Sequence, residues 1–309
     1  RVRMRAILLL WLVTAVSAET TSAQRARQGI LSLEDTRLFY EVMGSGDPIF
    51  IVHGGPGLDH EYLQPGLDAL GRGNPLVYYD QRGIGLSTGE LDPSTINMEA
   101  LVDDIDMLRQ VLGYQEISVL THSSGIFIGL EYASRYPDNL RSLILMNPID
   151  LGTQYSDQEA TRRRVAGTVE DSTELANLMA SEGFEARNPG TLSQVNRVLF
   201  RQALRDPARV SDLSLDLAEA TARNGEDVRR LIELSTGGID WWGRVSEINV
   251  PTLVLHGRYD LVPAGVSRDL AEALPQGRLT VLNSGHFPYL EDPDGLQSAV
   301  SGFFVELTR

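Results

Sequence analysis

The sequence predicts an α/β fold: a mostly parallel, doubly wound sheet interrupted by an inserted helical cap. Two observations predict it. Short apolar runs alternate with helix-like segments over residues 28–149 and again over 246–309, as is typical of parallel strands joined by crossover helices. Residues 150–245 are instead polar, rich in Arg, Glu, Asp and Ala, with helical patterns and no convincing strand. We therefore expect a core built from 28–149 and 246–309 and a helical cap over 150–245.

The amino-terminal residues 1–18 have the pattern of a secretory signal peptide. Three arginines stand among the first five residues, an apolar run extends from Ala6 to Val16, and small residues follow at Ser17 and Ala18. A spanning helix needs about 20 apolar residues, so the pattern favours a cleaved signal over a membrane anchor. We expect an exported protein, periplasmic or secreted, without stable membrane insertion after signal removal.

The first core segment contains six apolar runs with strand character and three helical patterns. Turn-forming residues between the first three runs favour a hairpin that leads into a buried strand. The third helical pattern ends before Pro137, which cannot continue a helix. Strands are expected at 30–33, 37–42, 48–52, 76–79, 117–121 and 140–146, and helices at 58–70, 97–112 and 126–136.

The second core segment repeats the alternation. Its expected strands are 252–256 and 279–282, and its expected helices are 264–273 and 296–307. Trp241 and Trp242 stand where the cap returns to the core. We expect them to anchor the cap by packing, because large aromatic side chains bury much apolar area; lining of the substrate pocket is the alternative.

Composition excludes several classes of function. The 309 residues carry a net charge of −15, from 42 acidic and 27 basic residues, which argues against nucleic-acid or anionic-membrane partners. All basic residues are arginine and there is no cysteine, so Schiff-base lysine, the phosphate-binding Walker lysine and thiol chemistry are excluded. The five histidines lack metal-ligand spacing. We expect no cofactor and no metal, and a small-molecule or short-peptide substrate.

Ser123 is the candidate nucleophile. It stands where the strand-like run 117–121 gives way to a helical pattern, the corner that bears the serine in the nucleophile-elbow motif G-x-S-x-G. Thr121 and Gly125 occupy the two glycine positions, so one of them differs. Ser124 is an alternative nucleophile, but Gly125 would then follow it directly and the spacing would fail. His122 is expected to pack beneath the corner.

Acyl transfer by serine also needs a base and an acid that orients it. His286 follows the expected strand 279–282, and Asp260 follows the expected strand 252–256. The order Ser, Asp, His along the chain is the one found with the elbow motif. Asp150, further beyond its own strand, remains an alternative acid.

A glycine-rich loop follows the expected strand 48–52. Its residues 53–57 are His-Gly-Gly-Pro-Gly, and glycine lets backbone N–H groups approach a bound carbonyl oxygen closely. We assign the oxyanion-stabilising donors to Gly55 and Ser124. A plain glycine turn is the alternative interpretation.

Several motifs together resemble the prolyl aminopeptidase (proline iminopeptidase) branch of the α/β-hydrolases. The resemblance implies an α/β-hydrolase fold, Ser123 as nucleophile, Asp260 as acid, His286 as base, and release of an amino-terminal residue, typically proline, from a peptide. The motifs are His53-Gly54-Gly55-Pro56-Gly57, Asp80-Gln81-Arg82-Gly83, the Ser123 corner, Gly257-Arg258-Tyr259-Asp260 and Ser284-Gly285-His286.

The chain departs from that family at the corner, where its members usually have G-G-S-W-G-[SG]. Thr121, Ser124 and Ile126 differ from this pattern. The family also holds the substrate amine with cap carboxylates, and none of the cap glutamates is assigned to that role from sequence. Hydrolysis of small esters or lactones therefore stays open, as does a non-catalytic small-ligand binding protein. The glutamates in question are Glu170, Glu174, Glu182, Glu185 and Glu233.

Overall fold

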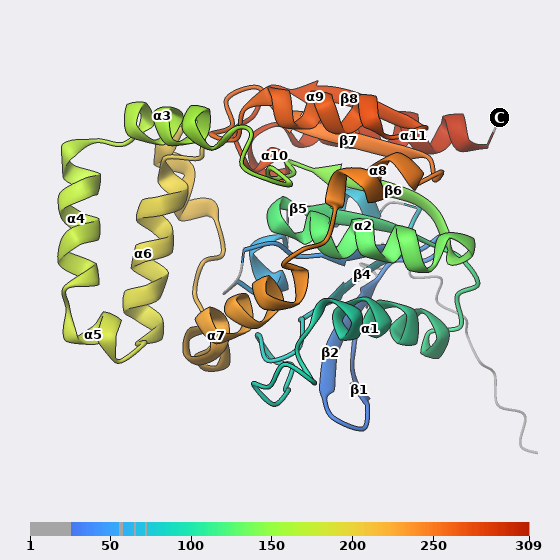
Figure 1. Cartoon of the computed structure of the whole chain (residues 1–309), viewed down its shortest axis with the longest axis horizontal. Helices are drawn as coiled ribbons and strands as arrows, with labels where there is room; N and C mark the ends of the chain where they lie inside the picture. The colour runs from blue at the N-terminus through green and yellow to red at the C-terminus, as the bar shows by residue number, and fades with distance from the viewer. Residues whose placement is uncertain (1–25, 56–57, 65, 72, 309) are drawn as a thin grey trace, which may run out of the picture.

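The computed structural model describes residues 26–55, 58–64, 66–71 and 73–308. Its centre is an eight-stranded sheet with the strand order β1-β2-β4-β3-β5-β6-β7-β8 (Figure 1). The strands are β1 (Arg27–Ser32), β2 (Arg37–Met43), β3 (Ile49–Val52), β4 (Leu76–Tyr79), β5 (Ile117–His122), β6 (Leu140–Met146), β7 (Thr252–Gly257) and β8 (Gly277–Leu282).

Strands β3 to β8 pair in parallel, whereas β1 and β2 form an antiparallel hairpin and β2 pairs antiparallel to β4. The mostly parallel, doubly wound sheet expected from the sequence is confirmed. Strand β3 lies between β4 and β5, and Val52 is in register with Thr121 at their carboxyl ends. The order of connections reverses here, and such switch points are where α/β sheets place their ligands.

Helices cover both faces of the sheet. The α-helices are α1 (Met98–Val111), α2 (Ile126–Arg135), α3 (Ser156–Ala166), α4 (Val169–Met179), α5 (Glu182–Glu185), α6 (Pro189–Arg201), α7 (Glu219–Thr236), α8 (Trp241–Glu247), α9 (Ala264–Ala273), α10 (Pro288–Glu291) and α11 (Pro293–Leu307). The 3-10 helices are η1 (His60–Tyr62), η2 (Asp68–Gly71), η3 (Ser123–Gly125), η4 (Pro137–Asn139) and η5 (Pro207–Asp212).

Two apolar clusters lie on opposite faces of the sheet because strand side chains alternate. In β3, Phe50 and Val52 join the cluster under α1, α2, α8 and α9. Ile49 and Ile51 join the other cluster, which α11 covers. All four side chains are essentially inaccessible to solvent, so β3 is a fully buried strand, as its uninterrupted apolar run predicted.

The helix expected over residues 58–70 does not form. The described part of this segment contains η1 and η2 instead. The sequence has Pro65 and Gly66 in the middle of the run, and both residues disfavour a continuous α-helix. Apolar spacing favoured a helix, but the leucines reach the core from shorter turns.

The chain between β6 and β7 is helical, and its described residues 147–251 contain no strand. Figure 1 shows α3 to α6 standing to one side of the sheet. Helix α4 begins with a capping box of Thr168 and Asp171, which satisfies two otherwise unpaired backbone amides. Helix α8 packs against α2 and α9. Trp241 is buried, with its ring 4.9 Å from that of Phe127 on α2, and Trp242 is partly buried against the apolar cluster that contains Phe50. The expected aromatic anchor is confirmed.

The signal peptide expected over residues 1–18 lies outside the described residues. Among the residues that the structure does describe, no helix is both long and apolar enough to cross a membrane.

Candidate active site

Ser123 lies at the corner between β5 and α2. Its φ is +54°, a left-handed conformation that costs a non-glycine residue roughly 1–2 kcal/mol. Such strain persists only where the surrounding structure enforces it, and it is concentrated at functional sites. Here β5 ends at His122 and η3 turns directly into α2. The backbone therefore lifts Ser123 out of the sheet at the carboxyl end of β5.

Thr121 fits at the corner because α2 makes room for it. A Cβ atom added to Gly129 would lie only 2.4 Å from Cγ2 of Thr121. Glycine at position 129 of the helix therefore leaves the space that the Thr121 methyl group fills. The departure at Thr121 is thus compensated locally, and the elbow conformation is preserved.

The strain at Ser123 yields a test of the elbow. We expect Ser123→Gly to be more stable than Ser123→Ala by about 1 kcal/mol, because only glycine adopts a positive φ without cost. At Ser134, an exposed position of α2, the same pair should differ in the opposite direction, since glycine weakens a helix. Urea unfolding of the four variants measures both differences. A less stable glycine variant at residue 123 would show that the conformation there is not left-handed.

Asp260 and His286 form a hydrogen-bonded pair beside this corner. Asp260 follows β7 and His286 follows β8, and His286 Nδ1 lies 2.8 Å from Asp260 Oδ2. The Asp260 side chain is 1% exposed, and its Oδ1 accepts the backbone N–H of Val262 at 3.0 Å. Burial raises the pKa of Asp260, but attraction to His286 and hydrogen bonds from His286 and Asn147 outweigh it and hold the pKa below its ordinary value. The carboxylate is therefore ionised at neutral pH.

Asn147 is part of this arrangement and was missed from sequence. It follows β6 with φ +48° and is fully buried. Its Nδ2 donates to Asp260 Oδ2 at 2.6 Å and to the carbonyl oxygen of Gly285 at 3.1 Å. One amide thus ties the acid to the loop that carries His286. The sequence feature that could have pointed to it is an asparagine directly after a strand, because asparagine tolerates the left-handed region that sharp turns require.

Asp150, the alternative acid, serves a different purpose. Its two carboxylate oxygens accept the backbone N–H groups of Gly152 and Tyr155, at 3.2 and 2.9 Å. A hydrogen bond from a backbone N–H to an aspartate side chain two residues earlier is a typical Asx turn. This turn shapes the loop that leads into α3. Within the described residues, Asp150 makes no hydrogen bond to His286.

His122 is buried beneath Ser123 and links three parts of the site. Its Nε2 donates to the carbonyl oxygen of His286 at 2.8 Å, and its Nδ1 accepts the Tyr62 hydroxyl at 2.7 Å. That hydroxyl in turn accepts the N–H of Gly54 at 2.9 Å. Burial, together with the nearby His286, lowers the pKa of His122 to about 3, so the ring is neutral. Because both ring nitrogens are occupied, His122 is a packed neighbour of the corner, as expected.

The loop after β3 approaches the corner closely. A Cβ atom on Gly54 would lie 2.3 Å from the carbonyl oxygen of His122 and 2.9 Å from Cβ of Ser123, so only glycine fits. Gly55 has φ +57°, and its N–H donates to Oγ of Ser124 at 2.9 Å. The Ser124 hydroxyl is therefore the present partner of the Gly55 amide, a contact that the sequence did not indicate.

The motif at residues 80–83 holds this loop in place through hydrogen bonds to His53. Gln81 donates its backbone N–H to His53 Nε2 at 3.1 Å and its side-chain amide to the His53 carbonyl at 2.8 Å. Burial lowers the pKa of His53 to about 4, which keeps this acceptor ring neutral. Arg82 binds Asp104 through two hydrogen bonds of 2.7 and 2.8 Å. The motif thus fixes the glycine loop, and Gln81 also lines the cavity beside it.

A cavity of about 200 Å³ adjoins the corner on the side of α7. The glycine loop and Ser124 line one wall, apolar side chains including Phe127 and Ile232 line most of the rest, and Glu233 contributes a carboxylate. Glu233 is ion-paired to Arg229, with 2.6 Å between Oε1 and Nη1. The cavity suits a small apolar group next to the serine.

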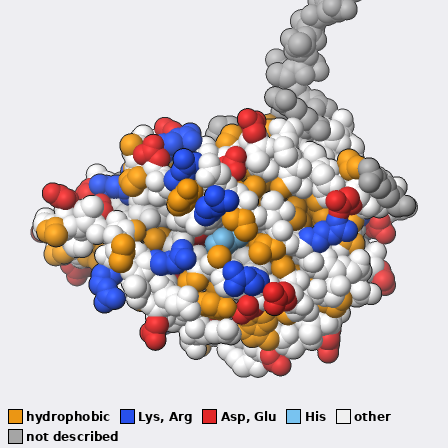
Figure 2. Space-filling view, turned by 90° about the horizontal axis from the view of Figure 1, so that it is seen from above, with side chains coloured by type: hydrophobic (Ala, Val, Ile, Leu, Met, Phe, Trp, Pro, Cys, Tyr) orange, Lys and Arg blue, Asp and Glu red, His pale blue; other side chains and the backbone are white. Residues whose placement is uncertain are grey.

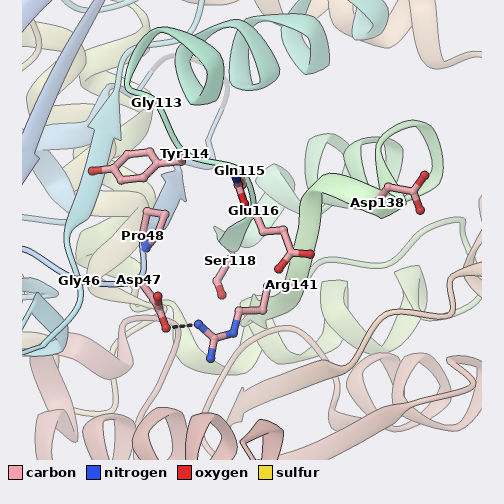
Figure 3. A pocket seen from close by; sticks show the side chains of 10 residues that line it. All are labelled: Gly46, Asp47, Pro48, Gly113, Tyr114, Gln115, Glu116, Ser118, Asp138 and Arg141. Carbon is pink, nitrogen blue, oxygen red and sulfur yellow. Dashed lines mark hydrogen bonds and ion pairs between the residues drawn. The ribbon is translucent and has the colours of Figure 1, made fainter.

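A larger cleft, of about 600 Å³, lies at the other end of the sheet. It adjoins the residues that precede β3, β5 and β6, and Figure 3 shows Arg141 directed toward Asp47, its ion-pair partner. In α/β sheets ligands bind at the carboxyl ends of the strands. Because this cleft lies at the amino ends of the strands, whereas Ser123, Asp260 and His286 follow their carboxyl ends, we do not assign the active site to it.

The structure brings the five sequence-predicted site residues to neighbouring strand ends. Ser123 and Ser124 follow β5, Gly55 follows β3, and Asp260 and His286 follow β7 and β8. In the described part of the chain, Ser123 and His286 are not hydrogen-bonded to each other; such contacts are often long in the absence of substrate. No group of three or more His, Cys, Asp or Glu among the described residues is placed to hold a metal ion.

Three comparisons relate this arrangement to known proteins. A family model described as the alpha/beta hydrolase fold matches residues 47–293. The chain is similar to a proline iminopeptidase of Saccharolobus solfataricus, 28% identical over 283 residues that cover 87% of this chain and 88% of the relative. A proline iminopeptidase of Heyndrickxia coagulans is 24% identical, with coverages of 85% and 92%. The crystal structure of proline iminopeptidase from Mycobacterium smegmatis has the same fold, with a TM-score of 0.67, 21% identity and coverages of 91% and 98%.

Proposed function

We propose that this chain, which belongs to the α/β-hydrolase family and is a hydrolase similar to proline iminopeptidases, is a serine hydrolase with Ser123 as nucleophile, His286 as base and Asp260 as acid. The observation that carries the proposal is the left-handed Ser123 at the end of β5 beside the hydrogen-bonded pair of Asp260 and His286. A pure binding protein needs neither the strained serine nor the buried pair.

The proposed reaction has two steps. Ser123 Oγ attacks the substrate carbonyl carbon while His286 Nε2 takes the hydroxyl proton, and Asp260 stabilises the resulting imidazolium through Nδ1–H. Collapse of the tetrahedral intermediate breaks the bond to the leaving group, which receives that proton, and leaves an acyl group on Ser123. Water then attacks the acyl carbon with the same base, which releases the acid and restores Ser123.

The developing oxyanion would be held by the backbone N–H groups of Ser124 and Gly55. Ser124 begins the turn into α2, where the first backbone amides have no partner within the helix. The Gly55 N–H now donates to the Ser124 hydroxyl. We propose that the substrate oxygen replaces this hydroxyl as the acceptor for the Gly55 N–H. Between turnovers the hydroxyl gives this N–H a hydrogen-bond partner that it would otherwise lack.

We further propose that the substrate is a peptide from which the amino-terminal residue is released. The cavity beside Ser124 and Gly55 would take the side chain of that residue, since its lining is largely apolar. Glu233 is the carboxylate in this cavity and would pair with the amino group. Removing a charged amine from water requires such a partner.

One observation favours a second candidate, hydrolysis of a small ester or lactone. Glu233 already pairs with Arg229, whereas an ester needs only the apolar cavity and no partner for an amine. A panel of proline and alanine p-nitroanilides, p-nitrophenyl esters and simple lactones separates the two. We expect turnover of the anilides that is lost when their amine is acetylated. Turnover of esters or lactones alone would overturn the peptidase proposal and leave the serine hydrolase in place.

The role of Glu233 can be tested separately. Glu233→Gln removes the negative charge but keeps the shape of the side chain, and we expect the KM for alanine p-nitroanilide to rise about tenfold, as expected for a lost charge-assisted hydrogen bond. Hydrolysis of p-nitrophenyl butanoate, which has no amine, serves as the internal reference. Equal effects on both substrates would mean that Glu233 shapes the cavity and does not hold the amine.

A further inference from the structure

Two arginines next to the active-site loops have no acidic partner. Arg162, on α3, donates from Nη1 to the carbonyl oxygen of Asp260 at 2.8 Å. Arg205 donates from Nη1 to the carbonyl oxygen of Asn283 at 3.2 Å, and its guanidinium lies 5.3 Å from the centre of the Tyr259 ring. Within the described residues, neither guanidinium has a carboxylate at ion-pair distance, and both side chains are exposed.

Unpaired arginines in an acidic chain are available to bind an external anion. Carboxylates outnumber basic residues by 42 to 27, and the neighbouring Arg163 is paired with Glu159 on the same helix. The carboxylate of Glu291, in the same region, accepts the backbone N–H groups of Asp206 and Gly285. The Glu291 carboxylate is therefore hydrogen-bonded to backbone N–H groups and is not paired with either guanidinium group.

Both arginines lie against the loops that carry the acid and the base. The loop after β7 and the loop after β8 are joined by a hydrogen bond of 2.9 Å from Tyr259 N to the Ser284 carbonyl. The backbone N–H of His286 donates to the carbonyl oxygen of Ala203 at 2.8 Å, two residues before Arg205. Figure 2 shows basic side chains gathered around a histidine that is visible from this face. The contacts of Arg162 and Arg205 place two positive charges directly against the loops that carry Asp260 and His286.

Among the described residues, the lining of the apolar cavity includes none from α3 or from the loops after β7 and β8. The cavity is bounded by the glycine loop, α2 and α7, and would hold the acyl part of the substrate. The leaving part must pass His286, because this residue protonates it. The arginines are therefore on the leaving-group side.

In each arginine, the guanidinium edge that can donate two parallel hydrogen bonds to one carboxylate has no partner among the described residues. Only Nη1 of Arg162 and of Arg205 is engaged, which leaves the edge formed by Nε and Nη2. Arg82 uses this same edge to bind Asp104. A planar carboxylate matches two parallel N–H donors of arginine.

We infer that the leaving part of the substrate carries a carboxylate, which Arg162 and Arg205 bind. The inference rests on the proposed serine hydrolase function and adds the chemical class of the leaving group. Two sources share this chemistry: the carboxyl terminus of a short peptide, and a carboxylated alcohol or phenol released from an ester. The acyl part is small and apolar, and the leaving part is anionic.

The test compares matched substrates that differ only in this charge. The butanoate ester of 4-hydroxybenzoate carries the carboxylate, and that of 4-hydroxybenzamide is neutral. The dipeptide Pro-Gly and its carboxyl-terminal amide form the peptide pair. We expect kcat/KM to be about tenfold higher for the charged member of at least one pair, the size of one charge-assisted hydrogen bond. The pair that shows the preference identifies the source.

The variants Arg162→Gln, Arg205→Gln and their combination should bring the ratio of kcat/KM for the charged and neutral members close to one, and a loss shared by both members of a pair does not affect this ratio. Arg164→Gln is the matched control: residue 164 is exposed on the same helix, and its guanidinium contacts Thr161. Added salt should lower the wild-type ratio, because exposed ion pairs are screened.

A wild-type ratio near one, or a ratio that the double variant leaves unchanged, would overturn the inference while the neutral substrates still report a working hydrolase. Failure of every substrate would overturn the proposed function, and the inference with it.

Discussion

Ser123→Ala is expected to lower kcat by roughly 10⁵- to 10⁶-fold, the loss typical of a removed serine nucleophile. Alanine has no atom that can attack the carbonyl carbon, and His286 and Asp260 then have no proton to move. The left-handed backbone at residue 123 is unchanged by the substitution, so the loss is chemical in origin. Hydrolysis of p-nitrophenyl butanoate by enzyme at high concentration measures the residual rate.

Circular dichroism of Ser123→Ala serves as the folding control, and Ser124→Ala distinguishes the two adjacent hydroxyl groups. Should Ser124→Ala be the inactive variant while Ser123→Ala keeps its activity, the nucleophile is Ser124. If neither substitution reduces turnover, hydrolysis does not proceed through this corner.

Asp260→Asn is expected to lower kcat by about 10⁴-fold. The substitution keeps the size of the side chain, but an amide cannot stabilise the imidazolium as a carboxylate does, and its NH2 group competes with Nδ1–H of His286. The effect should be large because Asp260 is buried and ionised, with its pKa held below the ordinary value by His286 and Asn147 despite burial. Steady-state hydrolysis of the same ester measures it.

Asp150→Asn is the matched control for the acid. Asp150 accepts only backbone N–H groups of its own turn, and asparagine forms the same turn, so the variant should keep activity within about twofold. A large loss in Asp150→Asn together with a small one in Asp260→Asn would move the acid to the loop after β6.

Much of the fold was predictable because local patterns and tertiary structure agree. The eight strand positions followed from short apolar runs, and α2 ends before Pro137 as the sequence indicated. The helix expected over 58–70 was wrong, because periodicity reports which residues reach the core and not the turn type that brings them there. The leucines of this segment still reach the core, but only Leu70 does so from within a 3-10 helix.

The site residues that could be predicted are those that a single segment of the sequence reveals. The candidates Ser123, Asp260 and His286 each follow an apolar run, and the order of the three is a property of the chain. Asn147 acts between two loops more than 100 residues away, through bonds to Asp260 and Gly285, and no local pattern reveals such a contact.

The contact between Gly55 and Ser124 was missed for the same reason. The two residues are separated by 69 positions and meet only because β3 and β5 are neighbours. The sequence indicated that both backbone amides stabilise the oxyanion. It could not show that the Ser124 hydroxyl accepts the hydrogen bond of the Gly55 N–H.

Covalent labelling tests the central claim, that Ser123 is an activated nucleophile, most directly. Serine hydrolases react with fluorophosphonates through the serine that the base activates, which gives one phosphonylated residue per chain. Intact mass and peptide mapping of the labelled protein should place a single adduct on Ser123, and Ser123→Ala should remain unlabelled. An adduct on Ser124 or on another residue, or no adduct while the ester is still hydrolysed, would contradict the account.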